Sequence, residues 1–246
     1  MTPADGADRS PVKRRVVKPA EVRRAELTAI ASRLFAAKGY DATTIEDVIA
    51  AAGVSKGAFY HHFRAKEDLL EAVVADYLGQ ARRQVEAVAN APNRSPLQRL
   101  TGVMRALRDW KAAHMTELGG VAPPSVLTEP GSLLHRLTSA ASEAFGPLLS
   151  KIIEDGARDG DFNVVDAGLA AELILGVSES RRPVLIQTIA LARAGDLGAA
   201  TELLVARVRA ECATMERLLG VPPGALDAAG LTQDLDAMLS DYLAVE

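Results

Sequence analysis

The sequence predicts an all-α protein, and three observations support this fold class. Apolar residues recur at spacings of three and four along most of the 246 residues, which is the period of helices that bury one face. Ala, Leu and Val are abundant, while aromatic residues make up only 4%. A composition led by Ala and Leu favours helices. No stretch has the apolar/polar alternation of a half-buried strand. We therefore expect helices throughout, separated by stretches rich in Gly and Pro.

The first segment differs from the rest because it lacks periodic apolar residues. It contains three Pro and the basic run Lys13-Arg14-Arg15, a composition that favours disorder. We interpret residues 1–20 as a disordered basic arm. Two roles stay open for it: the arm follows a phosphate backbone or enters a minor groove, or it is a solvated tail without a function.

The first helix is expected over residues 21–38. Leu27, Ile30 and Leu34 share one face of it, and Gly39 follows as a C-terminal stop. Thr43-x-x-Glu46 and Thr44-x-x-Asp47 each fit a capping box, so the next helix can begin in either of two frames. Both frames leave N–H groups at a helix start, where a phosphate could bind.

Residues 44–63 predict two short helices joined by the tight turn Ala52-Gly53-Val54-Ser55. Gly53 can adopt φ > 0 at the end of the first helix, and Ser55 can cap the second. Phe59 and Phe63 are four residues apart and point inward. A different face of the second helix carries small, cationic and hydrogen-bonding residues, namely Lys56, Gly57, Tyr60 and His61. Such a face suits the major groove of DNA.

Apolar periodicity then continues to the C-terminus and predicts a larger helical part. A fourth helix begins at residues 64–68 and runs toward Ala89, and the next one ends near Leu118-Gly119-Gly120 before a loop with Pro123, Pro124 and Pro130. The remaining helices are expected over residues 134–152 with a kink or junction at Gly146-Pro147, then over 169–177, 184–194 and 199–219, and finally from Leu231 to Leu243.

Composition excludes several classes of protein. The single cysteine, Cys212, excludes an internal disulfide and a zinc site built on cysteines. No apolar run approaches the eighteen or so residues of a membrane span, so we expect a cytoplasmic protein without membrane contact. The net charge is −4, but residues 1–70 hold twelve Lys/Arg against nine Asp/Glu. This asymmetry indicates a mildly basic end that could meet phosphates, although chance segregation would also explain it.

Chemical motifs give no support for an enzyme. The sequence has no phosphate loop after a strand, no His-Glu-x-x-His and no Gly-x-Ser-x-Gly, and neither His61 nor His62 has a nucleophile or carboxylate at a telling spacing. We expect no catalytic residue, metal or cofactor. An apolar ligand pocket could be lined by aromatic, sulfur-containing and imidazole side chains of the larger part, with Met104, Trp110, His114, Met115, His135 and Phe145 as candidates.

One group of motifs resembles a known family. Phe35-x-x-x-Gly39-Tyr40, Thr43-Thr44-Ile45, residues 51–57 (AAGVSKG), residues 59–63 (FYHHF) and residues 66–70 (KEDLL) closely resemble the N-terminal domain of TetR-family transcriptional regulators. The resemblance covers roughly residues 21–70. Beyond them it is only architectural, since these regulators have variable helical C-terminal domains.

The resemblance implies a helix-turn-helix DNA-binding domain at residues 21–68 and a helical effector-binding and dimerisation domain at 69–246. It further implies a homodimer that binds a pseudo-palindromic double-stranded DNA operator and represses transcription until an unidentified small-molecule effector binds. By position, Lys56, Gly57 and Ala58 would face base edges, and Tyr60, His61 and His62 would reach phosphates or bases. The backbone would be held by Thr44 and Lys66, with Ser55 at the start of the recognition helix. The dimer interface is expected on helices 166–194 and 199–219.

Two alternatives remain open from the sequence. The first is an all-α small-molecule-binding or enzymatic protein that carries a vestigial helix-turn-helix. The second keeps DNA binding but makes the protein an activator, or a regulator without a small-molecule effector.

Overall fold

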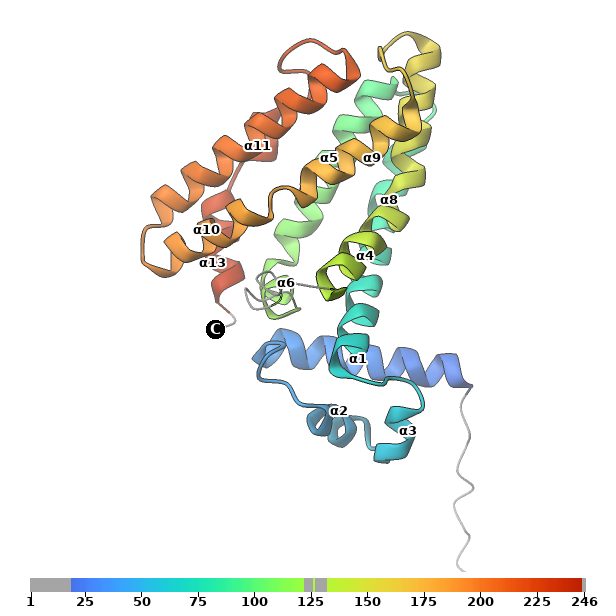
Figure 1. Cartoon of the computed structure of the whole chain (residues 1–246), viewed down its shortest axis with the longest axis vertical. Coiled ribbons are helices and arrows are strands. Elements are labelled where there is room, and N and C mark those ends of the chain that lie inside the picture. The colour runs from blue at the N-terminus through green and yellow to red at the C-terminus, as the bar shows by residue number, and fades with distance from the viewer. Residues whose placement is uncertain (1–18, 122–125, 127–131, 245–246) are drawn as a thin grey trace, which may run out of the picture.

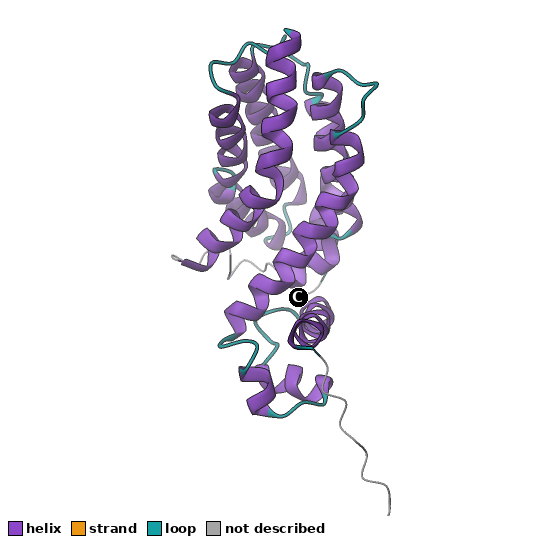
Figure 2. Cartoon of the chain, turned by 90° about the vertical axis from the view of Figure 1, so that its right-hand side faces the viewer, coloured by secondary structure: helices purple, strands orange, loops and turns teal. Residues whose placement is uncertain are grey.

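The computed structural model describes residues 19–121, 126 and 132–244, apart from the side chains of 132–135, 138, 178, 179 and 231. The described residues are helical with no strand, which confirms the predicted all-α class (Figures 1 and 2). Residues 1–18 of the predicted basic arm, the prolines of the Pro-rich loop and the side chain of His135 lie outside the described residues. The arm was predicted one residue too long, because Ala20 already belongs to the first helix. The helices are α1 (Ala20–Lys38), α2 (Ile45–Ala52), α3 (Lys56–Tyr60), α4 (Lys66–Ala89), α5 (Pro96–Ala113), α6 (Met115–Val121), α8 (Ser132–Asp159), α9 (Ala167–Glu179), α10 (Arg182–Arg193), α11 (Leu197–Leu219), α12 (Ala228–Leu231) and α13 (Leu235–Leu243).

Helices α1 to α3 form a small unit, which we call the head, at one end of the molecule (Figure 1). Its core contains Leu27 and Phe35 of α1, Val48 of α2, and Phe59 and Phe63 around α3, all buried. Phe59 and Phe63 therefore point inward as their spacing predicts. The N-terminal half of α4 contributes Leu69, Leu70 and Val73 to the same core, so α4 is rooted in the head.

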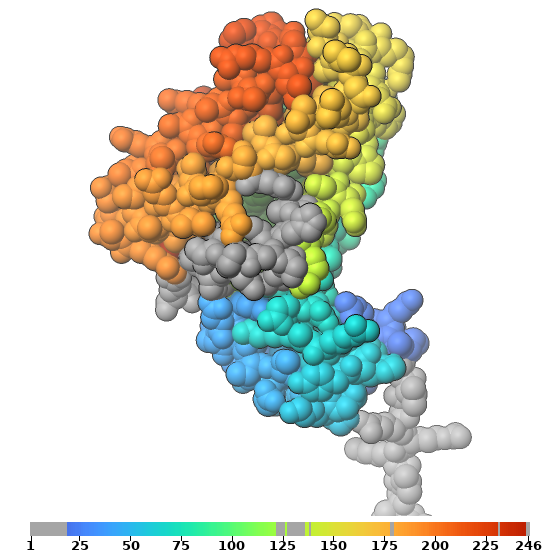
Figure 3. All heavy atoms as spheres, viewed as in Figure 1, coloured from blue at the N-terminus to red at the C-terminus, as the bar shows by residue number. Residues whose placement is uncertain are grey.

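The remaining helices form a larger part, which we call the body, on the far side of α1 (Figure 3). Its core is built mainly from α4, α5, α8, α9 and α11. Helix α4 joins the two cores because its C-terminal half supplies Ala81, Val85 and Ala89 to the body. With 24 residues this helix is roughly 36 Å long, so the head and body share one continuous element.

Two predicted helix boundaries are wrong. The helix expected to end near Leu118-Gly119-Gly120 ends instead at Ala113, and both glycines are buried inside a separate helix, α6. Two backbones pass so close to these glycines that a side chain would clash. In the sequence, a glycine required by such close packing looks the same as a glycine that ends a helix. The final helix is likewise two, α12 and α13, because Asp234 adopts φ 55° before the start of α13.

Helix α8 runs without interruption through Gly146-Pro147, where a kink or junction was expected. Pro183 lies at the first turn of α10 as predicted, a position where its missing N–H costs no hydrogen bond. No helix in the described part of the chain is both long enough and apolar enough to cross a membrane.

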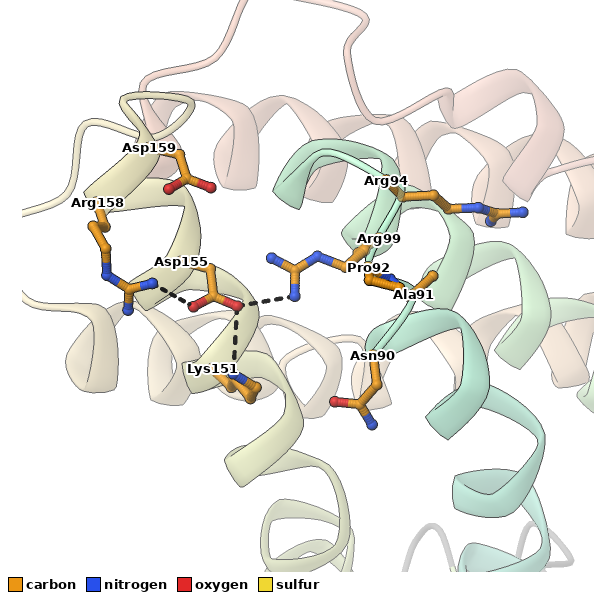
Figure 4. A pocket seen from close by; sticks show the side chains of 9 residues that line it. All are labelled: Asn90, Ala91, Pro92, Arg94, Arg99, Lys151, Asp155, Arg158 and Asp159. Carbon is orange, nitrogen blue, oxygen red and sulfur yellow. Dashed lines mark hydrogen bonds and ion pairs between the residues drawn. The ribbon is translucent and has the colours of Figure 1, made fainter.

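An ion-pair cluster holds the far ends of α4, α5 and α8 together (Figure 4). Arg99 is buried and donates from Nη1 to the Ala89 carbonyl oxygen at 3.3 Å and to Asp155 Oδ2 at 2.9 Å. Lys151 and Arg158 also approach Asp155, at 3.5 and 3.0 Å. Although burial opposes ionisation, the hydrogen bonds from Arg99 and Arg158 hold the pKa of Asp155 below its usual value. A cavity of about 320 Å³ lies beside the cluster.

Candidate nucleic-acid interface

The candidate interface begins at the N-terminus of α2, where the structure selects one of the two possible capping frames. Thr44 Oγ1 accepts from the Asp47 N–H at 3.1 Å, and the Thr44 N–H donates to Asp47 Oδ2 at 2.7 Å. Thr43 is buried instead, with its hydroxyl donating to the Gly39 carbonyl oxygen at 2.8 Å. Thr44 is exposed, so only its hydroxyl lies at a helix start that solvent or a phosphate can reach.

Asp47 is the acidic partner in this cap, and Lys38 of α1 lies 2.5 Å from the same carboxylate. Hydrogen bonds from the Lys38 ammonium and then from Thr44 hold the pKa of Asp47 well below its usual range. The carboxylate thus stays ionised at all ordinary pH values. This pairing ties the end of α1 to the start of α2.

The turn between α2 and α3 has the geometry that the sequence predicts. Gly53 adopts φ 61° in the left-handed region and ends α2, a conformation that is easy only for glycine. Ser55 Oγ then accepts from the Ala58 N–H at 3.2 Å and caps α3. These two residues set the direction of α3, whose buried Phe59 anchors it to the head core.

The outer face of α3 gathers most of the predicted contact residues. Lys56 has 68% of its side chain exposed, with its ammonium 3.5 Å from Glu46 of α2, and Gly57 has open space around it. Tyr60 and His61 are exposed, while Ala58 is half-buried between them and the core. The face therefore offers a cation, a phenol and an imidazole beside a residue that permits close backbone approach.

Arg24 of α1 holds the end of α3, and sequence reasoning missed it. Its Nη1 donates to the His62 carbonyl oxygen at 2.7 Å, and its guanidinium lies 4.2 Å from the centre of the Phe63 ring. His62 is only half-buried, but burial, then His61 and Arg24, lower the pKa of its imidazole. The only signal for this contact in the sequence is a basic residue one turn into α1. Basic residues at such positions are common on protein surfaces, so the signal does not point to a cap.

Lys66 at the start of α4 is oriented toward the head itself. Its ammonium donates to the Asp41 carbonyl oxygen at 3.2 Å and lies 4.2 Å from the centre of the Tyr40 ring. Burial lowers the pKa of this ammonium, against the opposing charge of Asp41. A contact between Lys66 and the DNA backbone remains a prediction. To make it, the ammonium would bind a phosphate from its place over the Tyr40 ring or would turn away from that ring.

Known proteins match the region that contains these residues. Residues 27–73 match the pattern described as "Bacterial regulatory proteins, tetR family". The HTH-type transcriptional repressor KstR2 of Rhodococcus jostii is 30% identical over 151 residues, which are 60% of this chain and 72% of that protein. The chain belongs to the TetR family.

The same repressor from Mycolicibacterium smegmatis is 38% identical over 84 residues, or 34% of this chain. That match spans 40% of the relative, so the chain aligns with less than half the length of this protein. A solved structure of RolR in complex with resorcinol has 23% identity and a TM-score of 0.58, and it covers 87% of this chain and 94% of its own. At this identity the likeness shows a shared fold, which extends over most of the body.

The residues predicted to line an effector pocket occupy different environments in this TetR-family body. Trp110 and His114 stack with ring centres 4.5 Å apart, and Trp110 also meets Tyr77 of α4 edge-on at 6.0 Å. Met104 packs against the body core and Phe145 is buried in it, whereas Met115 is half-buried at the start of α6. Their role in binding a ligand remains a prediction.

Lys111 is a further candidate that the sequence did not single out. Solvent reaches its side chain, yet enough protein surrounds the ammonium that burial lowers its pKa to about 8, helped by Arg181 and opposed by Glu211. Arg181 Nε donates to both carboxylate oxygens of Glu211 at 3.0 Å, and Arg207 Nε donates to one of them at 2.8 Å. The buried carboxylate of Glu211 is thus already paired with two guanidinium groups, in addition to the nearby charge of Lys111.

Cys212 neighbours this group on α11 and is buried. Burial, then the carboxylates of Glu216 and Glu211, raise the pKa of its thiol to about 11. The thiolate is the reactive form of cysteine, so this environment favours a packing role over a reactive one.

Proposed function

We propose that this TetR-family chain is a DNA-binding transcriptional repressor that binds a pseudo-palindromic operator as a homodimer and is released by a small-molecule ligand. The observation that carries the proposal is the outer face of α3, where Lys56, Tyr60 and His61 surround Gly57 on a capped, core-anchored helix. A helix presented in this way can enter a major groove. Residues 21–68 would form the DNA-binding domain and residues 69–246 the sensing and dimerising domain.

Specificity and affinity would come from different groups at this surface. Lys56 can donate to O6 and N7 of a guanine, whereas Tyr60, His61 and the α2 N-terminus at Thr44 would bind phosphates. Phosphate contacts release counterions, so binding should weaken steeply as salt rises. Two copies of α3 in one dimer would meet half-sites separated by one helical turn of DNA or slightly more.

An electrophoretic mobility shift assay on a selected oligonucleotide pool tests the proposal directly. We expect salt-sensitive binding to a pool that converges on an inverted repeat. A pool that fails to converge, with no salt-sensitive shift, would favour the alternative of a small-molecule-binding or enzymatic protein with a vestigial helix-turn-helix. A reporter gene placed behind the selected operator then separates repression from activation.

Replacing Lys56 by Ala should weaken operator binding by about 1–3 kcal/mol and relax specificity at one base pair. The substitution removes the cation at the centre of the outer α3 face, while the cap by Ser55 and the anchor at Phe59 stay in place. Binding to the operator and to every single-base variant of it, measured at two salt concentrations, checks this result.

Lys151→Ala is the matched control, because Lys151 is also an exposed cation, at 59% against 68% for Lys56, and it lies on α8 in the body. It should leave operator affinity unchanged. If Lys56→Ala weakens binding to every base variant equally, Lys56 contacts phosphate only and the base contact assigned to it is wrong.

The proposed homodimer is supported by an apolar stripe on α9. Val165 just before the helix is fully exposed, and Leu169 and Leu173 are 54% and 48% exposed. These residues are four apart and so lie on one side of the helix. The neighbouring helix α11 exposes the small side chains of Ala206 and Ala210. Exposed apolar stripes of this kind mark protein interfaces, and both helices are among those expected at the interface.

The effector proposed here carries an acidic group. Among the described residues the Lys111 ammonium has no hydrogen-bond or ion-pair partner, and the carboxylate that acts on it, Glu211, already binds Arg181 and Arg207. An anion bound beside this ammonium would favour its charged form, against the surrounding protein that lowers its pKa. An anionic ligand would supply the missing charge, with Trp110 and His114 one residue before and three residues after Lys111 as its apolar neighbours.

Lys111→Met should therefore weaken the response to acidic ligands while operator binding persists. A metabolite extract is split by anion exchange into acidic and neutral fractions, and each fraction is added to the protein–operator complex. We expect the acidic fraction to release the wild-type protein and to release Lys111→Met at least about tenfold less effectively, as expected when a charge-assisted contact of roughly 1.5–3 kcal/mol is lost.

Lys111→Arg retains the charge and Lys151→Met removes a cation elsewhere, so both should respond like the wild type. Release by the neutral fraction alone would contradict the acidic effector but would leave the ligand-released repressor intact.

A further inference from the structure

Helix α6 lies between the head and the C-terminal helix α13, and its two consecutive glycines face these neighbours. A Cβ atom at Gly120 would fall well inside 3.0 Å of the Phe35 carbonyl oxygen at the end of α1. A Cβ atom at Gly119 would fall equally close to the Tyr242 carbonyl oxygen of α13. Each glycine therefore allows one backbone to touch α6 where no other residue would fit.

A backbone hydrogen bond fastens the head side of this contact. The Tyr40 N–H, in the turn after α1, donates to the Gly120 carbonyl oxygen at 2.8 Å. Tyr40 packs edge-on against Phe35 at 5.2 Å between ring centres, and both are buried. A shift of α6 would thus displace Tyr40, and with it the packing of the head core.

The C-terminal segment is in turn fastened to α5. Arg105 forms an ion pair with Asp227 at 2.5 Å, and Arg108 donates to the Gln233 carbonyl oxygen at 2.5 Å, just before α13 begins. Leu235 and Leu239 of α13 are buried in the body core. Burial also raises the pKa of the Tyr242 phenol to about 12. Helix α13 is therefore fixed to the body at its start and pressed against α6 at its end.

We infer that Gly119 and Gly120 are positioning residues, and that α13 acts as a strap that holds α6 against the head and so sets the position of α3 relative to the body. This inference goes beyond DNA binding and ligand release, because it concerns how α6 and α13 hold the head on the body. Without the strap α6 would keep its contact with α1 but lose the backing that limits its movement.

Hydrogen exchange at the Tyr40 amide measures this effect without DNA or ligand. In Gly119→Ala the new Cβ pushes α13 and α6 apart, and in a chain that ends at Asp234 the strap is absent. We expect the Tyr40 amide to exchange at least about tenfold faster in both variants, because less free energy is then needed to open the contact locally. Amides of α2, on the other side of the head, should exchange as in the wild type.

Two further substitutions make the result decisive. Gly120→Ala presses directly on the α1 backbone and should accelerate exchange at Tyr40 whether or not α13 is a strap. Gly146→Ala is the matched control, since its Cβ would meet only Leu175 at an ordinary 3.8 Å. If Gly120→Ala accelerates exchange but Gly119→Ala and the shortened chain do not, α13 is only a cover for the body and the inference is overturned.

Discussion

Replacing Leu169 and Leu173 together by Glu should convert the protein to a monomer and weaken operator binding by at least about 100-fold, because linked binding events commonly gain 10²–10⁴ in avidity. Both leucines project from α9 with about half of their surface exposed. In the proposed homodimer each copy would bury the other copy's stripe, as a two-fold interface requires. Two carboxylates facing two more across the axis would combine repulsion with lost apolar contact.

Sedimentation at micromolar concentration gives the assembly state, and a mobility shift with the selected operator gives the affinity. Ala157→Glu, at an exposed site on α8, adds a carboxylate elsewhere on the body and should change neither. Circular dichroism confirms that the helices persist. A double variant that remains dimeric would show that the interface lies on other helices, and one that is monomeric with full affinity would show that a single head suffices for binding.

Replacing Asp155 by Ala should lower the free energy of unfolding by about 3–5 kcal/mol, the usual cost of removing one partner from a buried ion pair. The side chains of Arg99 and Asp155 are only 10% and 15% exposed. Arg99 would keep the Ala89 carbonyl oxygen as its hydrogen-bond acceptor but would lose its counterion. Replacing both residues by Leu should recover much of the loss, because no buried charge then remains unpaired.

Urea unfolding of the wild type, Asp155→Ala and the double variant measures these differences. Glu154→Ala removes the adjacent but exposed carboxylate and should change stability by no more than about 0.5 kcal/mol. The folded-state pKa of Asp155 is lowered, so its contribution is complete above the unfolded-state value of about 4. The advantage over Asp155→Ala should disappear as the pH falls through the lower folded-state value. Equal losses for Asp155→Ala and Glu154→Ala would show that the pair contributes little.

The positions that sequence reasoning located correctly are those at which local chemistry decides the conformation. Gly53 ends α2 because it can adopt φ > 0, and Ser55 caps α3 because its hydroxyl reaches the Ala58 N–H. Phe59 in α3 and Phe63 just after its end are both buried, as their spacing of four residues predicts. Each of these properties depends on residues no more than four positions apart, so a single sequence contains the information.

The properties that were missed depend on residues far apart in the chain. Arg24 caps α3 from 38 positions away, and the charges that act on Lys111 belong to Arg181 and Glu211, far along the chain. Gly119 and Gly120 resembled the end of a helix because the backbones that require them, at Tyr242 and Phe35, are supplied by other elements. No periodicity or motif within α6 could have distinguished these two cases.

The sequence by itself therefore determined the all-α class, most of the helices and the exposed face of α3, because periodicity, capping and turn chemistry act over a few residues. Only the tertiary structure decided which capping frame α2 uses, where α5 ends, which charges act on Lys111 and how α13 touches α6. Those outcomes depend on which backbones and charges are brought within contact distance, and that is a property of packing between helices far apart in the chain.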